Sequence, residues 1–195
     1  MKINGYEIKP DASLLYADLQ DANLYEANLR GADLLYANLQ GANLERAYLL
    51  RAGLRGVNLE GASLLFANLK GTNLRNADLK DADLQGVILK EAYLGDANLQ
   101  KTNLRHANLR GASLYSANLQ GANLQGANLR HADLQGANLH KANLQDTDLR
   151  HANLRDADLE GAVLSPCSRF IHELLGAKNL NKSFVKVDGV IKAYY

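Results

Sequence analysis

Leucine occupies every fifth position along most of this chain. The run begins at Leu14 and ends at Leu164, and it comprises 31 consecutive quintets with no exception. The residue directly before leucine is Asn in 16 quintets and Asp in 7, so a polar position alternates with the apolar ones. The residue two places before leucine is Ala in 26 quintets, and the exceptions are Val57, Thr72, Val87, Thr102 and Thr147. We call these the Leu, polar and small positions, and the two residues after leucine the first and second corner positions.

A period of five fits neither common secondary structure. On an α-helix, leucines five residues apart would spread around all sides, because each residue turns by about 100°. On a straight strand, an odd step would send successive leucines to opposite faces. Every leucine can face inward only if the chain bends once per quintet. The pattern therefore predicts a β-solenoid whose stacked coils lie about 4.8 Å apart.

The quintet Ala37-Asn38-Leu39-Gln40-Gly41 is typical of the repeat and resembles the pentapeptide-repeat family. The resemblance covers 155 of the 195 residues. It implies an all-β solenoid, a right-handed quadrilateral β-helix with four quintets per coil and about eight coils. On this interpretation, residues 12–166 form the β-helix and side chains 20 positions apart stack on one face.

The other quintet positions suit such a coil. Short Asn and Asp side chains can accept hydrogen bonds from nearby backbone and can stack into ladders. Glycine ends 11 quintets, where a positive φ is expected. Hydroxyls of the three threonines at the small position are expected to donate to backbone carbonyls.

Both flanking segments are predicted to cap the coil. Residues 1–11 contain Asn4-Gly5, a typical hairpin turn, and Pro10 ends the extended segment. Residues 167–195 are expected to contain a short helix that starts at Ser165-Pro166 or at Ser168 and ends at Gly176. A hairpin or an extended tail around Asp188-Gly189 follows it. The alternative role for the C-terminal segment is a homodimer interface, because members of the resembled family can pair through their C-terminal ends.

Composition narrows the function classes. Lys and Arg total 22 and Asp and Glu total 21, which argues against a general nucleic-acid binder. The single cysteine, Cys167, rules out an internal disulfide and favours a reducing, cytoplasmic location. The sequence has no apolar run of signal-peptide or membrane-spanning length, so no membrane partner is expected.

Two outward-facing groups of side chains are candidate interaction sites. The first is a basic column at the first corner position, made of Arg30, Lys70, Lys90, Arg110, Arg130 and Arg150. It could bind phosphate, nucleic acid or an acidic partner, or it could be a solvated face. The second is an apolar group, made of Leu15, Tyr16, Leu35, Tyr36, Tyr93 and Tyr115. It could be a protein interface, or a terminal segment could fold over it. Two smaller pairs, Tyr48 with Leu50 and Leu65 with Phe66, are interpreted as incidental.

Candidate catalytic chemistry is sparse. His131 and His151 should stack one coil apart, with Asp148 nearby. We interpret this arrangement as surface variation rather than as a metal site. Cys167 has only His172 as a nearby base, so a nucleophilic role is not expected. We predict no catalytic residue, no cofactor and no metal.

The sequence therefore favours a non-enzymatic scaffold that binds an unidentified protein partner. The resemblance adds one alternative, because some pentapeptide-repeat proteins act as DNA mimics that bind type II topoisomerases. That role is associated with a strongly negative surface, which the near-neutral repeat does not predict. Anion or weak nucleic-acid binding through the basic column is a further alternative.

Overall fold

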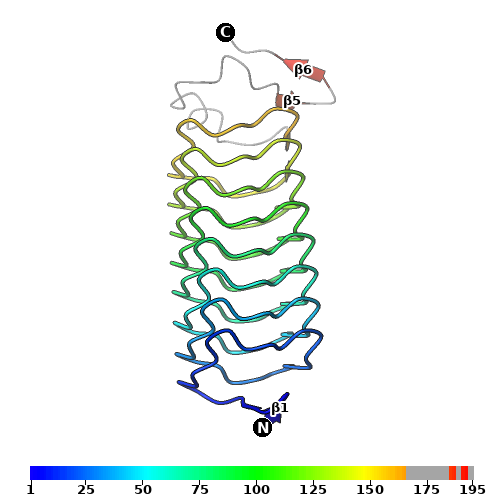
Figure 1. The fold of residues 1–195 in the computed structure, drawn as a ribbon. Helices are drawn as coiled ribbons and strands as arrows, with labels where there is room; N and C mark the ends of the chain where they lie inside the picture. The colour runs from blue at the N-terminus through cyan, green and yellow to red at the C-terminus, as the bar shows by residue number, and fades with distance from the viewer. Residues whose placement is uncertain (166–184, 188–189, 193–195) are drawn as a thin grey trace.

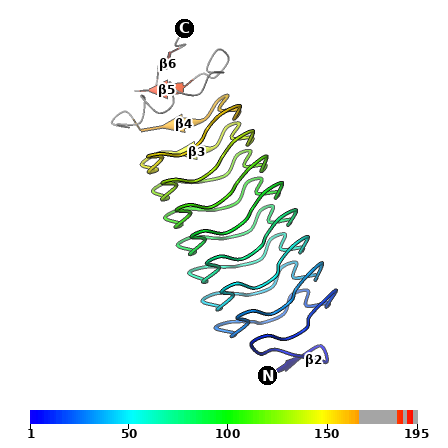
Figure 2. The same ribbon diagram turned by 90° about the vertical axis from the view of Figure 1, so that its left-hand side faces the viewer.

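The fold is a four-sided solenoid of stacked coils, shown in Figures 1 and 2. A computed structural model of the chain describes residues 1–165, 185–187 and 190–192, with side chains for 1–165. The polar position of each quintet forms a parallel bridge with the residue 20 positions later, from Ser13↔Asp33 to Asn138↔Asp158. The coil is therefore 20 residues long, which confirms the expected four quintets.

Backbone hydrogen bonds join each coil to the next. In the first quintet, the Leu14 amide donates to the Asp33 carbonyl at 2.7 Å and the Tyr16 amide donates to the Leu35 carbonyl at 3.0 Å. The Asp33 amide returns a bond to the Ala12 carbonyl at 2.9 Å. The same three hydrogen bonds recur along the rod. Stacking of the coils therefore satisfies the backbone amides and carbonyls, although neighbouring coils pair through single bridges rather than through long strands.

Each corner is a β-turn closed by the leucine carbonyl, as in the 3.0 Å bond from the Ala17 amide to Leu14. The second corner position has a positive φ at every fifth residue from Asp11 to Gly161. Eleven of these 31 residues are glycine, as expected, and the other 20 are side-chain-bearing residues. Since L-residues pay about 1–2 kcal/mol in this conformation, the stacking must hold these corners against local preference.

The interior is filled by the Leu and small positions. All 31 leucines from Leu14 to Leu164 are buried, with at most 4% of their surface exposed. The Thr72 hydroxyl donates to the Leu69 carbonyl at 2.7 Å, and those of Thr102 and Thr147 donate to carbonyls of the preceding coil at 2.9 Å. These bonds confirm the prediction that the buried threonine hydroxyls donate to backbone carbonyls.

The polar position bonds in two directions. Within a quintet, its side-chain oxygen accepts from the amide of the first corner position, as in the 3.0 Å bond from Glu45 to Asn43. Between coils, asparagine amides donate to the same position of the coil before, as in Asn103 to Asp83 at 2.8 Å and Asn143 to Asn123 at 3.2 Å. Both uses were predicted from the Asn and Asp content.

The N-terminal segment is an antiparallel hairpin of β1 (Lys2–Ile3) and β2 (Tyr6–Glu7), turning at Asn4-Gly5 as predicted. Ile3 and Tyr6 pack against the core, and Ile8, which follows β2, is buried within it. The side-chain amide of Asn4 donates to the Asp18 carbonyl at 3.2 Å. The hairpin therefore lies against the first coil.

At the other end, four short strands form one sheet. β3 (Asn143–Leu144) and β4 (Val163–Leu164) continue the coil stack in parallel, and β5 (Val185–Val187) pairs parallel to β4. β6 (Val190–Lys192) pairs antiparallel to β5, which is the predicted hairpin around Asp188-Gly189. The sheet gives the backbone edge of β4 a partner from the C-terminal segment. The expected helix after Ser165 falls on residues outside those that the structure describes.

Candidate interaction surfaces

The coil has four faces, which we number by their first leucine: Leu14 (face 1), Leu19 (face 2), Leu24 (face 3) and Leu29 (face 4). Faces 1 and 2 meet at the corner that carries Leu15, Tyr16, Leu35 and Tyr36, here called the N-terminal patch. The rings of Tyr16 and Tyr36 stack with centroids 5.6 Å apart and an interplanar angle of 10°. Tyr16 is 66% exposed and Tyr36 is 47% exposed.

Neither described terminal segment covers the N-terminal patch. The hairpin of β1 and β2 packs on the first coil and still leaves Leu15 44% exposed. β5 and β6 pair with β4 at the opposite end of the rod (Figure 1). Among the described residues, no terminal segment therefore covers the exposed aromatic stack.

Tyr93 and Tyr115 do not join this patch. Tyr93 lies in the middle of face 1, where the guanidinium of Arg75 lies over its ring at 5.3 Å from the centroid. Tyr115 shares the corner column of Leu35, but Arg55, Arg75 and Gly95 occupy that column between them. Tyr93 and Tyr115 therefore lie further along the same side of the rod, and arginines separate them from the N-terminal patch.

Face 4 carries a further apolar group that the sequence interpretation treated as incidental. Tyr48 and Ile88 are at its polar position, two coils apart, and Phe66 lies at its edge on the coil between. They are 52%, 39% and 54% exposed, respectively. The signal was present in the sequence, because aromatic or branched apolar residues replace Asn at positions 48 and 88 of one column.

The basic column lies along the corner between faces 4 and 1, as predicted, but its members differ in their surroundings. The guanidinium of Arg150 donates twice to the Asp148 carboxylate, at 2.9 and 2.6 Å, and these bonds lower the pKa of Asp148 below its ordinary value. Lys90 Nζ lies 3.4 Å from Glu91. Arg130 Nε is buried without a hydrogen-bond partner among the described residues. The basic residues of the column therefore differ in ion pairing and burial, although the sequence shows a nearly continuous row of Lys and Arg.

Lys70 and Arg110 lie on either side of Lys90 in the column, and Arg30 lies near its N-terminal end. Within the described part of the chain, none of the three forms an ion pair. Arg30 and Arg110 are exposed, and Lys70 is half-buried. These three cations remain available to an external anion, as does Arg130, which forms no ion pair within the described residues either.

Imidazoles occur in two different arrangements. His131 and His151 stack with centroids 4.9 Å apart, as the register predicted, while the nearby Asp148 is engaged by Arg150. A second arrangement on face 2 joins His140 to Asp158 and Glu160 of the next coil, with one ligand atom of each residue within 4.8 Å of the others. Sequence reasoning missed this group, although a step of 20 residues places position 160 above position 140.

Stacked five-residue repeats around a buried leucine column define a quadrilateral β-solenoid as the class of protein. A family model for pentapeptide repeats matches this chain in eight copies, over residues 12–49, 52–90, 92–130 and 127–165. The chain therefore belongs to the pentapeptide-repeat family, whose fold is a right-handed β-helix. A search of curated proteins found no significant match.

Three solved structures illustrate the similarity. QnrB1, a plasmid-mediated fluoroquinolone resistance protein, is 21% identical with a TM-score of 0.58, over 86% of this chain and 88% of its own. A pentapeptide repeat protein from the thylakoid lumen of Arabidopsis thaliana is 24% identical with a TM-score of 0.51, over 71% and 86%. HetL, a pentapeptide repeat protein involved in heterocyst differentiation regulation in Nostoc, is 37% identical with a TM-score of 0.46, over 80% and 85%. Within the described residues, no helix is long and apolar enough to cross a membrane.

Proposed function

We propose that this chain is a non-enzymatic, cytoplasmic scaffold that binds a protein partner through outward-facing side chains. Leucine and the small residues fill the interior of the coil, so binding groups are confined to the surface and the two ends. The observation that carries the proposal is the exposed Tyr16–Tyr36 stack with Leu15 and Leu35 beside it. Rigid aromatic side chains of this kind are enriched where proteins bind one another.

The test is a fourfold variant, Leu15→Gln, Tyr16→Asn, Leu35→Gln and Tyr36→Asn. The same columns naturally carry Gln135 and Asn76, and asparagine tolerates the positive φ of the second corner position. An aromatic anchor at an interface contributes about 2 kcal/mol or more, so partner binding should weaken by more than about tenfold. Affinity capture from the host, followed by titration of the captured protein, measures this.

The matched control changes apolar residues elsewhere on the rod. Tyr48→Asn restores the residue found at positions 28 and 68 of its column and leaves the N-terminal patch intact. We expect the control to retain the partner and both variants to unfold at temperatures near that of the parent chain. Equal partner affinity for the fourfold variant and the parent would exclude the N-terminal patch as the binding surface.

Anion binding through the basic column is a second candidate, supported by the cations of Lys70 and Arg110 that have no described ion-pair partner. Replacing Lys70, Lys90 and Arg110 by Glu should abolish retention of a DNA duplex at low salt. Binding of the parent chain should itself be weak and should fall steeply with salt, because phosphate contacts release counterions. Arg150→Gln is the control, since Arg150 is already bound to Asp148. Retention of DNA by the triple Glu variant would reject the column.

We do not extend the proposal to a DNA mimic that binds a topoisomerase. The repeat, residues 12–166, contains 15 Lys and Arg against 17 Asp and Glu, far from a strongly negative rod. QnrB1 shares the fold at 21% identity, and this likeness carries no partner over to the present chain. The C-terminal segment stays open as a homodimer interface, which light scattering of the full chain would test.

A further inference from the structure

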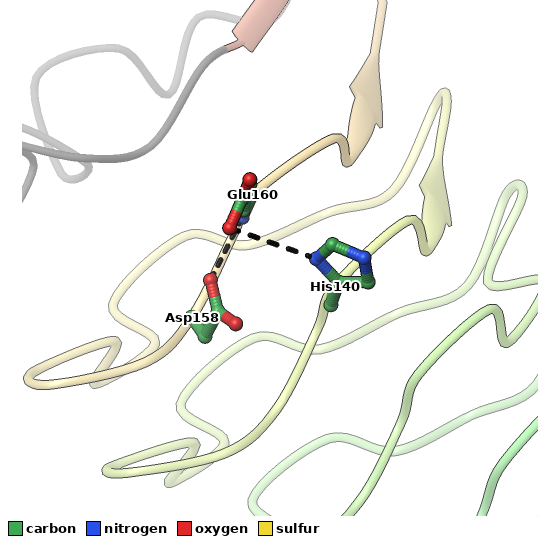
Figure 3. A group of neighbouring side chains, drawn as sticks. All are labelled: His140, Asp158 and Glu160. Carbon is green, nitrogen blue, oxygen red and sulfur yellow. Dashed lines mark hydrogen bonds and ion pairs between the residues drawn. The ribbon is translucent and has the colours of Figure 1, made fainter.

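The strongest unassigned chemistry on the surface is the group formed by His140, Asp158 and Glu160 on face 2. Figure 3 shows the three side chains pointing toward one another across two adjacent coils. His140 Nδ1 lies 4.0 Å from a Glu160 carboxylate oxygen, and the Asp158 carboxylate accepts the Glu160 backbone amide at 3.0 Å. His140 is half-buried, while the two carboxylates are exposed.

This combination occurs once along face 2. The three positions involved are the first corner of one coil and the polar and first corner positions of the next. Each of the six preceding sets contains at least one Gln, Asn or Lys, which cannot serve as an anionic or imidazole ligand. The repeat brings these positions together in every coil, but only His140, Asp158 and Glu160 supply three metal-binding groups.

One earlier set shows how carboxylates at these positions are otherwise neutralised. Glu60 and Asp78 lie beside Lys80, whose ammonium is 3.1 Å from the Glu60 carboxylate. That ion pair raises the pKa of Lys80. Four coils later, His140 occupies the corner position equivalent to Glu60, and Glu160 occupies the one equivalent to Lys80. The carboxylates there face an imidazole, which can share a metal cation with them.

We propose that His140, Asp158 and Glu160 bind a divalent transition-metal ion, with zinc as the best match. Imidazole nitrogen and carboxylate oxygen are both zinc ligands, and water can complete a coordination shell that has three protein ligands. Bonds of about 2.0–2.2 Å in a tetrahedron place ligand atoms about 3.3–3.6 Å apart. The ligand atoms now lie up to 4.8 Å apart. Shifts of about 1 Å in the two exposed carboxylate side chains would shorten these separations to the zinc range.

The bound ion would connect two neighbouring coils near the C-terminal end of the repeat. His140 belongs to one coil, and Asp158 and Glu160 to the next, which leads directly into β4. The Asp158 carboxylate is already oriented by the Glu160 amide, the kind of contact that holds a ligand in place. Because only the folded chain brings the three together, zinc should raise the melting temperature, and the rise should grow with the logarithm of its concentration above the dissociation constant.

The experiment is a titration of the full chain, without an affinity tag, with Co²⁺ and Zn²⁺. The visible absorption of Co²⁺ reports coordination, and competition by Zn²⁺ gives its affinity. The variants His140→Gln, Asp158→Asn and Glu160→Gln install residues found at the same positions one or two coils earlier: Gln120, Asn138 and Gln120, respectively. The parent chain should bind one ion, and each variant should bind at least about tenfold more weakly and lose the zinc-dependent rise in melting temperature.

Controls separate this site from other ligands in the chain. His151→Gln removes one ring of the His131–His151 stack, and Cys167→Ser with His172→Gln removes the thiol and imidazole of the C-terminal segment. Both controls should bind Co²⁺ as the parent does. Absence of saturable binding, or binding that survives His140→Gln and is lost in a control, would overturn the proposal. The outcome is independent of the protein partner and of the N-terminal patch.

Discussion

The Leu99→Asp variant is expected to lose the native solenoid or to unfold over its central coils. Leu99 has no exposed surface and lies in a column with Leu79 and Leu119 of the adjacent coils. The substitution removes a buried leucine, which costs about 2–5 kcal/mol, and places an unpaired carboxylate in the interior, which adds several kcal/mol. The total rivals the whole free energy of unfolding of a typical domain, about 5–15 kcal/mol.

The neighbouring position provides the matched control. Gln100 points outward, and its side-chain amide donates to Gln120 at 3.2 Å. Gln100→Asp removes that one hydrogen bond from a half-buried site and should cost about 1 kcal/mol or less. Thermal unfolding followed by circular dichroism compares the two variants, and limited proteolysis would detect an opened middle. Similar melting temperatures for Leu99→Asp and Gln100→Asp would contradict the inward and outward assignment.

The sequence predicted a solenoid because a five-residue period buries every leucine only if the chain bends once per quintet. The inward leucines, the hydroxyl of Thr72 bonded to the Leu69 carbonyl and the turn at Asn4-Gly5 all follow from local geometry. The four-sided coil came from the family resemblance, since a five-residue period is compatible with other polygons. The C-terminal hairpin at Asp188-Gly189 was found from its turn residues, while its pairing with β4 depends on long-range contacts that no local pattern specifies.

The candidate sites were less predictable for a physical reason. A 20-residue register gives the column of each side chain, as it did for Tyr16 above Tyr36, but it does not give the partner that each side chain selects. Arg150 turns to Asp148 two residues away, so the basic column contains a cation that is already paired. The group at His140 was missed because its third member, Asp158, lies in the neighbouring polar column, so no single stacked column contains all three residues.

The Gly86→Val variant is expected to be strongly destabilising for a substitution at a corner. Gly86 has a φ of +66°, and a Cβ there would lie 2.5 Å from the ring of Phe66 in the preceding coil. A β-branched residue at this φ costs about 2 kcal/mol, and displacing the ring adds about 1–2 kcal/mol. Gly61→Val isolates the first cost, because Gly61 has a φ of +65° and no heavy atom within 4 Å of its Cβ position.

A double-mutant cycle with Phe66→Asn tests whether the ring is the cause. Asparagine occupies position 76 of a corresponding corner, and it accepts a positive φ without a ring. In the Phe66→Asn background, Gly86→Val should cost no more than Gly61→Val, so the cycle should return a coupling of about 1–2 kcal/mol. Urea unfolding measures the free energies of unfolding of the parent, the two single variants and the double variant. A coupling near zero would mean that backbone conformation alone selects glycine at position 86. A large coupling would show that aromatic residues at one corner select glycine at the corner of the next coil.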